Sequence, residues 1–434
     1  MKNLKLPILT QSVFFIILLG ITPLLYNKDP EIFHLYKLRN IYASIGIIFL
    51  VSIFTFRYFK NQYKLSFKVF KTERILILIM GFFLFCSLFQ NMSEMKLYAY
   101  NGYVPLGLFY GAGPNNLSIA FYFVSMLFLL SAIPSVKNVY HKWINIGIMI
   151  SLVTVGMIII YQIFVNNFME HGRLYLFGFG NSNYLPDPFA IVGLLLLIPL
   201  LFNKKINLVS SLVGVFFFGI VLLSLSRAAF IGLFISLLVV LIYLIVSKKI
   251  ILKRSILLFL VAIITLTGVV YYLNSIGQAA LLNDFKSFLK VFTGDKTLSG
   301  ISSMRTDVWK AAIDLTFANP LTTIFGNGQS VFIMEEAGKT YLATNVHNQY
   351  IDVLLSGGIV VFGIFVFLLV KQMIYAFKIV KYDINNISLL AALVFIYVKW
   401  FFNSLNALHS PFILIVFVLI SSRYMNMLKE TNQV

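Results

Sequence analysis

The chain has 434 residues, of which 60% are hydrophobic and 16% aromatic but only 11% charged, and its formal net charge is +19. A soluble domain carries about 25% charged residues, so the composition excludes an ordinary soluble protein and predicts an integral membrane protein. The single cysteine, Cys86, excludes an intramolecular disulfide, so polar segments must become ordered by packing alone.

Crossing about 30 Å of hydrocarbon takes about 20 apolar residues in a helix. By that rule the sequence predicts an all-α polytopic fold with about twelve transmembrane helices, forming a single integral membrane domain over residues 1–434. The predicted spans are 8–26, 41–57, 75–92, 117–136, 143–165, 186–202, 206–225, 228–247, 255–275, 350–371, 386–407 and 409–425.

The connectors between these spans alternate in charge. One set, which includes both ends of the chain, holds 21 of the 34 Lys and Arg but only three of the 15 Asp and Glu. By the positive-inside rule this set is cytoplasmic, which places both termini inside. Topology and anionic lipid headgroups then explain the basic charge, and we expect membrane lipids but no nucleic acid as partners.

The longest polar segment, residues 276–349, is then one large extracytoplasmic loop, with six Lys or Arg balanced by six Asp or Glu. A loop of this length is usually functional or partly structured. Within it, apolar residues recur at helical spacing over 304–318, and Pro320 follows the end of that pattern. This predicts a short amphipathic helix that lies on the membrane surface or over the mouth of a cavity.

Three arginines on the predicted outer side are candidate anion ligands. Arg227 follows Ser224-Leu225-Ser226 at a seam where two spans have almost no connector. Its planar guanidinium suits a phosphate or diphosphate, although a snorkelling arginine would look the same. Arg305 and Arg173 could complete a cationic cluster, with an exposed surface charge as the alternative.

His347 ends the long loop just before the span that begins at Tyr350. Because an imidazole titrates near neutral pH, His347 can act as a general base toward a hydroxyl group. The alternative is an interfacial histidine bonded to headgroups. Its neighbour Asn348 is a secondary candidate, as is Asn183 in the turn-rich connector 166–188.

Lys399 is a lone cation in the span 386–407. Intramembrane cations are functional hypotheses by default, so it is a further secondary candidate, although its long side chain could instead snorkel to the interface. No His, Cys or carboxylate cluster has the spacing of metal ligands. We therefore expect neither a metal nor any other cofactor.

Together these residues resemble the bacterial O-antigen ligase/O-antigen polymerase (Wzy-type) superfamily over residues 165–370. The shared motifs are Ser224-Leu225-Ser226-Arg227 opening a span, Arg305-x-x-x-Trp309, Pro320, Gly326-x-Gly328 with Phe332, His347-Asn348-x-Tyr350 followed by Gly358, and upstream Arg173 with Phe179-Gly180-Asn181-Ser182-Asn183. One departure is Ser356, where the family often has an acid.

The resemblance implies a multi-pass glycosyltransferase of the bacterial cytoplasmic (inner) membrane that takes an undecaprenyl-diphosphate-linked glycan as donor on the outer face. It implies that Arg227, Arg305 and Arg173 bind the diphosphate, and that His347 deprotonates the acceptor hydroxyl, with inversion at the anomeric carbon. Its expected partners are the donor, a glycan acceptor and other polysaccharide-assembly proteins.

Three functions remain open from the sequence, besides a structural or sensory membrane protein in which the outward arginines and histidine would be idle. A polymerase would join repeat units of a capsular or O-antigen-type polysaccharide, whereas a ligase would move finished glycan to a separate acceptor with the same motifs. A membrane transporter would need polar or broken spans at the bilayer midplane and internal pseudo-symmetry. The polar residues of this sequence gather instead toward one predicted surface, which favours the enzyme.

Overall fold

The structure of this chain, a computed structural model, describes residues 69–90, 186–202, 208–224, 226–248, 305–327, 332–336, 339–343, 346–402 and 411–431, with isolated positions at 153, 156–157, 169–170, 173–174, 267–268 and 271. These residues are overwhelmingly helical. The helices are α4 (Lys71–Gln90), α7 (Pro186–Leu197) with the 3₁₀ turn η5 (Ile198–Leu201), α8 (Leu208–Leu223), α9 (Arg227–Val246), α13 (Arg305–Thr316), α14 (Pro320–Phe325), α15 (Gln349–Tyr382), the 3₁₀ turn η6 (Ile384–Asn386), α16 (Ile387–Phe402) and α17 (Pro411–Glu430).

Three helices of the described part are long and apolar enough to cross a membrane: Ala228–Val246, Gln349–Tyr382 and Ile384–Phe402. The apolar stretches Pro186–Leu201 and Leu208–Leu223 are shorter. On α9 the exposed apolar residues recur every three or four positions along one face, as expected for a helix that faces lipid. They are Ile231, Phe234, Leu238, Ile242 and Ile245. These features confirm a helical membrane protein.

The predicted spans 75–92, 186–202, 206–225, 228–247, 350–371, 386–407 and 409–425 each coincide with a helix or a helix plus its 3₁₀ turn. The other predicted spans and both termini lie outside the described residues, except for single turns. The span predicted to end at 371 is longer, because α15 continues to Tyr382. Lys371 is compatible with this helix: its ammonium group lies 5.6 Å from the centre of the Phe367 ring, while the buried face continues through Tyr375 and Ile379.

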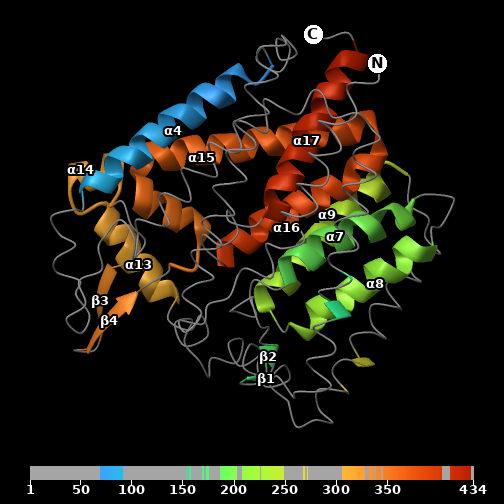
Figure 1. Cartoon of the computed structure of the whole chain (residues 1–434), viewed down its shortest axis with the longest axis horizontal. Helices are drawn as coiled ribbons and strands as arrows, with labels where there is room; N and C mark the ends of the chain where they lie inside the picture. The colour runs from blue at the N-terminus through green and yellow to red at the C-terminus, as the bar shows by residue number, and fades with distance from the viewer. Residues whose placement is uncertain are drawn as a thin grey trace, which may run out of the picture.

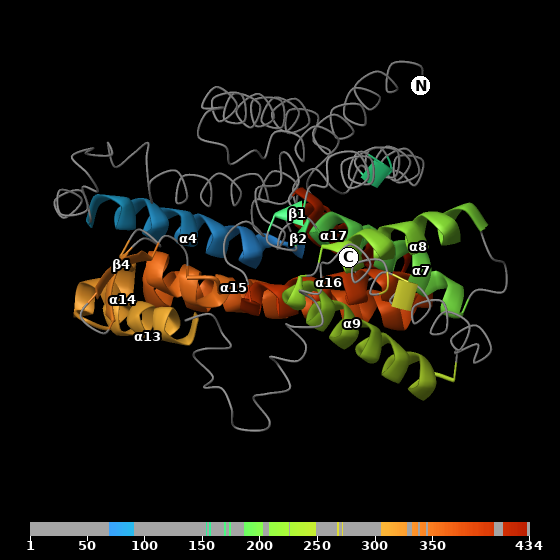
Figure 2. The ribbon, with the colours of Figure 1, turned by 90° about the horizontal axis from the view of Figure 1, so that it is seen from below.

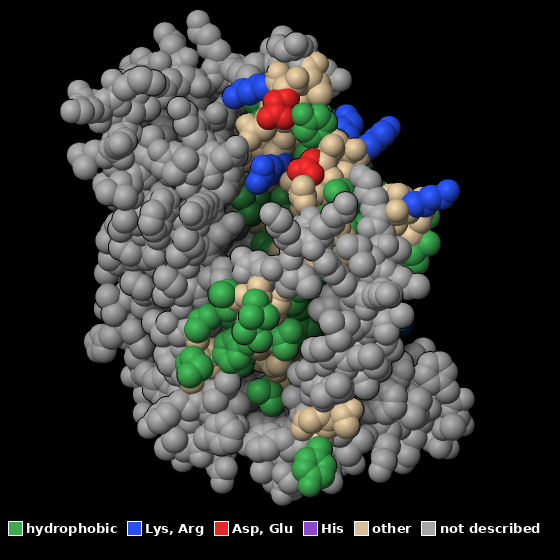
Figure 3. All heavy atoms as spheres, turned by 90° about the vertical axis from the view of Figure 1, so that its right-hand side faces the viewer, with side chains coloured by type: hydrophobic (Ala, Val, Ile, Leu, Met, Phe, Trp, Pro, Cys, Tyr) green, Lys and Arg blue, Asp and Glu red, His purple; other side chains and the backbone are tan. Residues whose placement is uncertain are grey.

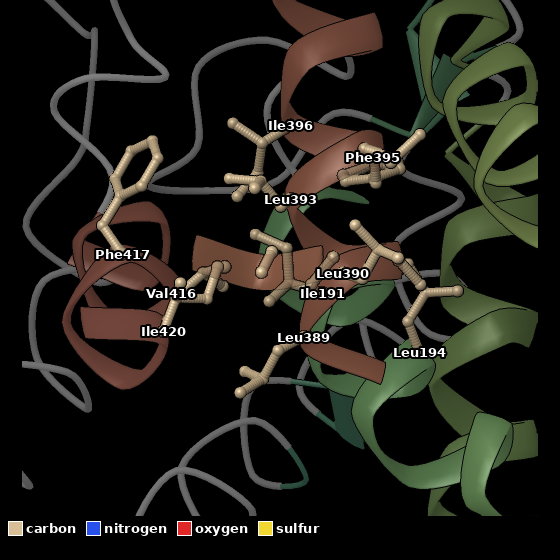
Figure 4. Close-up of a cluster of buried hydrophobic side chains, with 14 of the residues drawn as sticks. Ile191, Leu194, Leu389, Leu390, Leu393, Phe395, Ile396, Val416, Phe417 and Ile420 are labelled. Carbon is tan, nitrogen blue, oxygen red and sulfur yellow. The ribbon is translucent and has the colours of Figure 1, made fainter. Parts of the chain in front are cut away.

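Helix α16 lies at the centre of the described part and packs against α7, α9, α15 and α17. In both ribbon views α4 runs along α15, α13 and α14 lie at the end where α15 begins, and α7, α8 and α9 lie toward the other end (Figures 1 and 2). Figure 4 shows apolar side chains of α7 and α17 beside those of α16. The labelled residues are Ile191 and Leu194; Leu389, Leu390, Leu393, Phe395 and Ile396; and Val416, Phe417 and Ile420.

Figure 3 shows one face of the molecule, on which the largest group of described hydrophobic side chains lies in the lower half and most of the described Lys, Arg, Asp and Glu side chains lie in the upper half. A separation of apolar from charged surface is expected when helices cross a bilayer, because charged residues are costly within the hydrocarbon.

Two short antiparallel hairpins add to the helical fold that the sequence predicted. Strand β1 (Met169–Glu170) pairs with β2 (Arg173–Leu174), and β3 (Phe332–Glu336) pairs with β4 (Lys339–Ala343). Each pair is joined by two residues, and both connections contain a glycine, which suits a tight hairpin turn. The pattern of apolar residues did not indicate these strands, because all four are short.

Candidate functional site

Helix α13 is fastened to the last residues of α16 by both residues of its Arg-x-x-x-Trp motif. Nη1 of Arg305 donates to the carbonyl oxygen of Phe402 at 2.9 Å. One turn later, Trp309 packs edge-on against Phe401, with ring centres 5.5 Å apart. Residues four apart lie on the same helix face, so this spacing lets both side chains contact the end of α16 from one face of α13.

Trp309 also holds the backbone next to His347. Its indole Nε1 donates to the carbonyl oxygen of Val346 at 2.9 Å. The Val346 side chain is buried in a small apolar core with Ala312 of α13 and Leu355 of α15. The residue before His347 is therefore held by both packing and a hydrogen bond.

The residue after His347 is held as firmly. Asn348 is the N-cap of α15, and its buried Oδ1 accepts from the amides of Tyr350 and Ile351 at 3.0 and 3.2 Å. This is the usual way in which an asparagine satisfies the first amides of a helix. The helix then runs on, since the Asp352 amide donates to the Asn348 carbonyl at 2.9 Å. Capping fully accounts for the side-chain oxygen of Asn348.

Between these two fixed neighbours, His347 has a positive φ of 56° and a half-buried side chain. Among the described non-glycine residues only Lys248 shares a positive φ, and it follows the last turn of α9, where a left-handed residue is common. His347 instead precedes a helix. A left-handed non-glycine residue costs free energy and often marks a functional position. The backbone conformation therefore supports His347 as a candidate functional residue.

The start of α15 is also supported from behind by two glycines. α15 is broken at Gly358, whose φ is 69°, and Gly326 at the end of α14 has a φ of 76°. The backbones of α14 and α15 meet here: the amide of Asn327 donates to the carbonyl of Leu355 at 2.7 Å. His347 is therefore followed by a short helix, 349–357, set against α13 and α14.

Arg305 reaches this same place. The bond from its guanidinium to the Phe402 carbonyl places this side chain at the last turn of α16. The side chain is half-buried at the first turn of α13. The structure thus brings Arg305 and the His347 segment to one end of α16.

Arg227 is the first residue of α9, and only three residues separate it from the end of α8, so the tight seam predicted from the sequence is confirmed. Both seam serines are occupied with the backbone: Ser226 caps α9 through Ala229, and Ser224 donates to Val221. The side chain of Arg227 lies outside the described part. A cation at a helix N-terminus opposes the helix dipole, and the anion-binding role expected of Arg227 stays a prediction.

Arg173 lies in β2, opposite Glu170 in β1. Its side chain lies outside the described residues, and so does Asn183. The structure therefore leaves the site roles expected for both residues as predictions.

Lys399 does not snorkel to an interface. Its side chain is buried, and its ammonium group is paired with the carboxylate of Asp187 in the first turn of α7. Sequence reasoning missed Asp187, which it placed among the polar residues of a connector. The sequence signalled only that a lone charge at membrane depth needs a partner, and not which residue that partner is.

The apolar helices and the polar junction of α13, α15 and α16 define a helical membrane protein with a candidate site at one end of its central helix. Residues 212–366, from α8 to the middle of α15, match the family described as O-Antigen ligase. This match covers about a third of the chain and agrees with the superfamily resemblance drawn from its motifs. The matched range contains Arg227, Arg305 and His347. No curated protein matches the chain.

Proposed function

We propose that this chain is a metal-independent glycosyltransferase of the bacterial cytoplasmic membrane. Its donor is an undecaprenyl-diphosphate-linked oligosaccharide at the outer face, and its product is a capsular or O-antigen-type polysaccharide built by joining repeat units. The observation that carries the proposal is that Arg305 and the segment around His347 meet at one end of α16. Both residues lie inside the range that matches the O-Antigen ligase family.

The proposed step is an inverting substitution at the anomeric carbon. The acceptor hydroxyl oxygen forms the new bond from the side opposite the diphosphate, and its proton passes to the imidazole of His347. The bond between the anomeric carbon and the diphosphate oxygen breaks, and undecaprenyl diphosphate leaves with both bonding electrons. Arg305, Arg227 and Arg173 hold the negative charge that develops on it, because bidentate guanidinium groups suit phosphate oxygens.

The half-burial of His347 favours this role over an idle interfacial residue. A base must reach the substrate and yet be held still, since a misplacement of about 1 Å can cost about 100-fold in rate. His347 is partly open while both of its neighbours are buried and bonded. That combination is what a positioned general base requires.

The second candidate is a ligase that moves finished glycan to a separate acceptor, and the description of the matched family favours it. The two functions differ in their acceptor. Purified protein supplied with the lipid-linked repeat unit alone should produce a ladder of longer lipid-linked glycans if it is a polymerase. A ligase should produce nothing until a second acceptor is added.

Replacing His347 and Arg227 with alanine in turn tests the chemistry. Each variant should lose glycan transfer while the protein still reaches the membrane, and Lys310→Ala, an exposed change on α13, serves as the control. Unchanged product length and yield in both variants would remove the enzymatic proposal. A reporter fused near Lys296 should be active only outside the cytoplasm, which tests the proposed orientation.

A further inference from the structure

The ion pair between Asp187 and Lys399 is buried at the same end of α16 as the candidate site. The Lys399 side chain is 2% exposed and that of Asp187 is 8% exposed. The pair joins the last turn of α16 to the first turn of α7. Its charges are matched to each other, so Lys399 is poorly placed to bind a diphosphate itself.

Such a pair adds little to stability. Removing two charges from water costs about as much as their attraction returns, and apolar replacements of similar volume are often neutral or stabilising. The best-attested use of a buried polar pair is to fix the register of the elements that it joins. The pair is therefore expected to fix the register of α16 against α7.

Three of the contacts made by the last six residues of α16 lead to the candidate site. The Tyr397 carbonyl accepts from the Tyr350 hydroxyl at 3.0 Å, the Phe401 ring packs on Trp309, and the Phe402 carbonyl accepts from Arg305. Tyr350 lies three residues after His347, and Trp309 holds the carbonyl just before it. A rotation or shift of this turn would thus move both site residues.

We propose that Asp187 and Lys399 are positioning residues, which fix the end of α16 so that Arg305 and His347 keep their spacing. They touch neither substrate. The inference rests on the proposed function, since it assigns the pair to the site of that reaction. It adds α7, which lies outside the matched family range, to the elements on which the site depends.

The test replaces both charges at once, with Asp187→Leu and Lys399→Met in one protein. Single changes would leave a buried charge unpaired and would not fold reliably. The apolar pair should unfold at or above the wild-type temperature, yet its kcat should fall by about tenfold or more, since small displacements of a catalytic group cost that much. The reversed pair, Asp187→Lys with Lys399→Asp, should recover most of this loss.

A matched control removes another buried polar contact between helices. Gln372 of α15 donates from Nε2 to the Ser421 hydroxyl of α17 at 3.2 Å, and both residues are buried. Gln372→Met with Ser421→Ala should leave kcat at the wild-type value. A purely structural role of the Asp187–Lys399 pair predicts the same result for the apolar pair.

Three outcomes would overturn the positioning role: wild-type kcat in the apolar pair, failure of that pair to fold, or a reversed pair no more active than the apolar one. Failure of the proposed function looks different. Transfer that survives His347→Ala removes the proposed function, whereas transfer that needs His347 but is unaffected in the apolar pair removes only the positioning role.

Discussion

Gly326 and Gly358 lie back to back, and each occupies a backbone conformation that favours glycine. A Cβ on Gly358 would overlap the carbonyl of Ile324 and the amide nitrogen of Gly326, and a Cβ on Gly326 would overlap the carbonyl of Ser356. Both residues have positive φ. This contact sets α14 against the break in α15 and so supports the short helix that follows His347.

The first prediction is that Gly358→Ala and Gly326→Ala each destabilise the protein by about 1–3 kcal/mol through backbone strain alone. The overlap adds to this cost, because the neighbouring atoms are backbone and cannot rotate away. Glycan transfer should fall as well, since the two helix ends must separate. Thermal unfolding of the purified protein measures the first effect, and initial rates measure the second.

Gly363→Ala is the matched control for this prediction, because Gly363 lies in the same helix and a Cβ there meets nothing within 4 Å. Alanine should be neutral or stabilising by about 0.5–1 kcal/mol, since it is the better helix former. If Gly358→Ala and Gly363→Ala unfold at the same temperature, the close approach does not exist in the folded protein.

The second prediction concerns the hydrogen bond from Trp309 to the Val346 carbonyl. Trp309→Phe keeps a ring against Phe401 but removes the indole N–H that bonds to Val346. The loss of this hydrogen bond should cost about 1 kcal/mol in stability. Because the backbone before His347 is released, transfer should fall by about tenfold, more than the loss of folding explains. Rates and unfolding temperatures of the same preparation separate the two effects.

Trp400→Phe is the control for Trp309→Phe. The Trp400 side chain is buried in the core, and its Nε1 has no hydrogen-bond partner among the described residues. Its replacement removes ring volume but no hydrogen bond, so stability should fall while transfer per folded molecule falls less than in Trp309→Phe. Equal losses of transfer in the two variants would mean that ring size, and not the bond to Val346, matters at position 309.

Much of the helical scaffold could be predicted, because long apolar runs have few alternatives in a membrane. The span 228–247 and helix α9 agree within one residue, and the helix predicted over 304–318 is α13. The missed helix α14 had its own signal: Pro320 was taken as the end of one helix, whereas Asn319 caps the next, with Pro320 as its first residue.

Contacts between distant residues were beyond reach of the sequence. Asp187 and Lys399 are 212 positions apart, and no local pattern selects that partner. The meeting of Gly326 with Gly358 depends on positive φ at both, which hydrophobic periodicity does not encode. The motif residues Arg305 and Trp309 were recognised by resemblance, but their actual partners, Phe402 and Val346, offer only backbone carbonyls, which carry no sequence signal.

The third prediction separates capping from chemistry at Asn348. Asn348→Ala should cost about 1 kcal/mol, the usual price of losing an N-cap, whereas Asn348→Ser should keep most of the stability because serine is also a good cap. Transfer in Asn348→Ser should stay close to wild type. A serine variant that folds normally but has lost transfer would instead show that the amide group takes part in the reaction.

The fourth prediction compares two tyrosine–glutamate contacts that differ in burial. The Tyr375 hydroxyl donates to the buried carboxylate of Glu73, and the Tyr382 hydroxyl donates to Glu430 at 2.7 Å on the exposed surface. Tyr375→Phe leaves a buried carboxylate without that donor and should cost about 1–3 kcal/mol. Tyr382→Phe should have no resolvable effect, because water replaces the lost donor. Unfolding temperatures measure both changes. Equal shifts would mean that the Glu73 carboxylate is not buried between α4 and α15.

Neither change should alter the rate of transfer per folded molecule. Both tyrosines lie near the end of α15, more than 20 residues along the chain from His347.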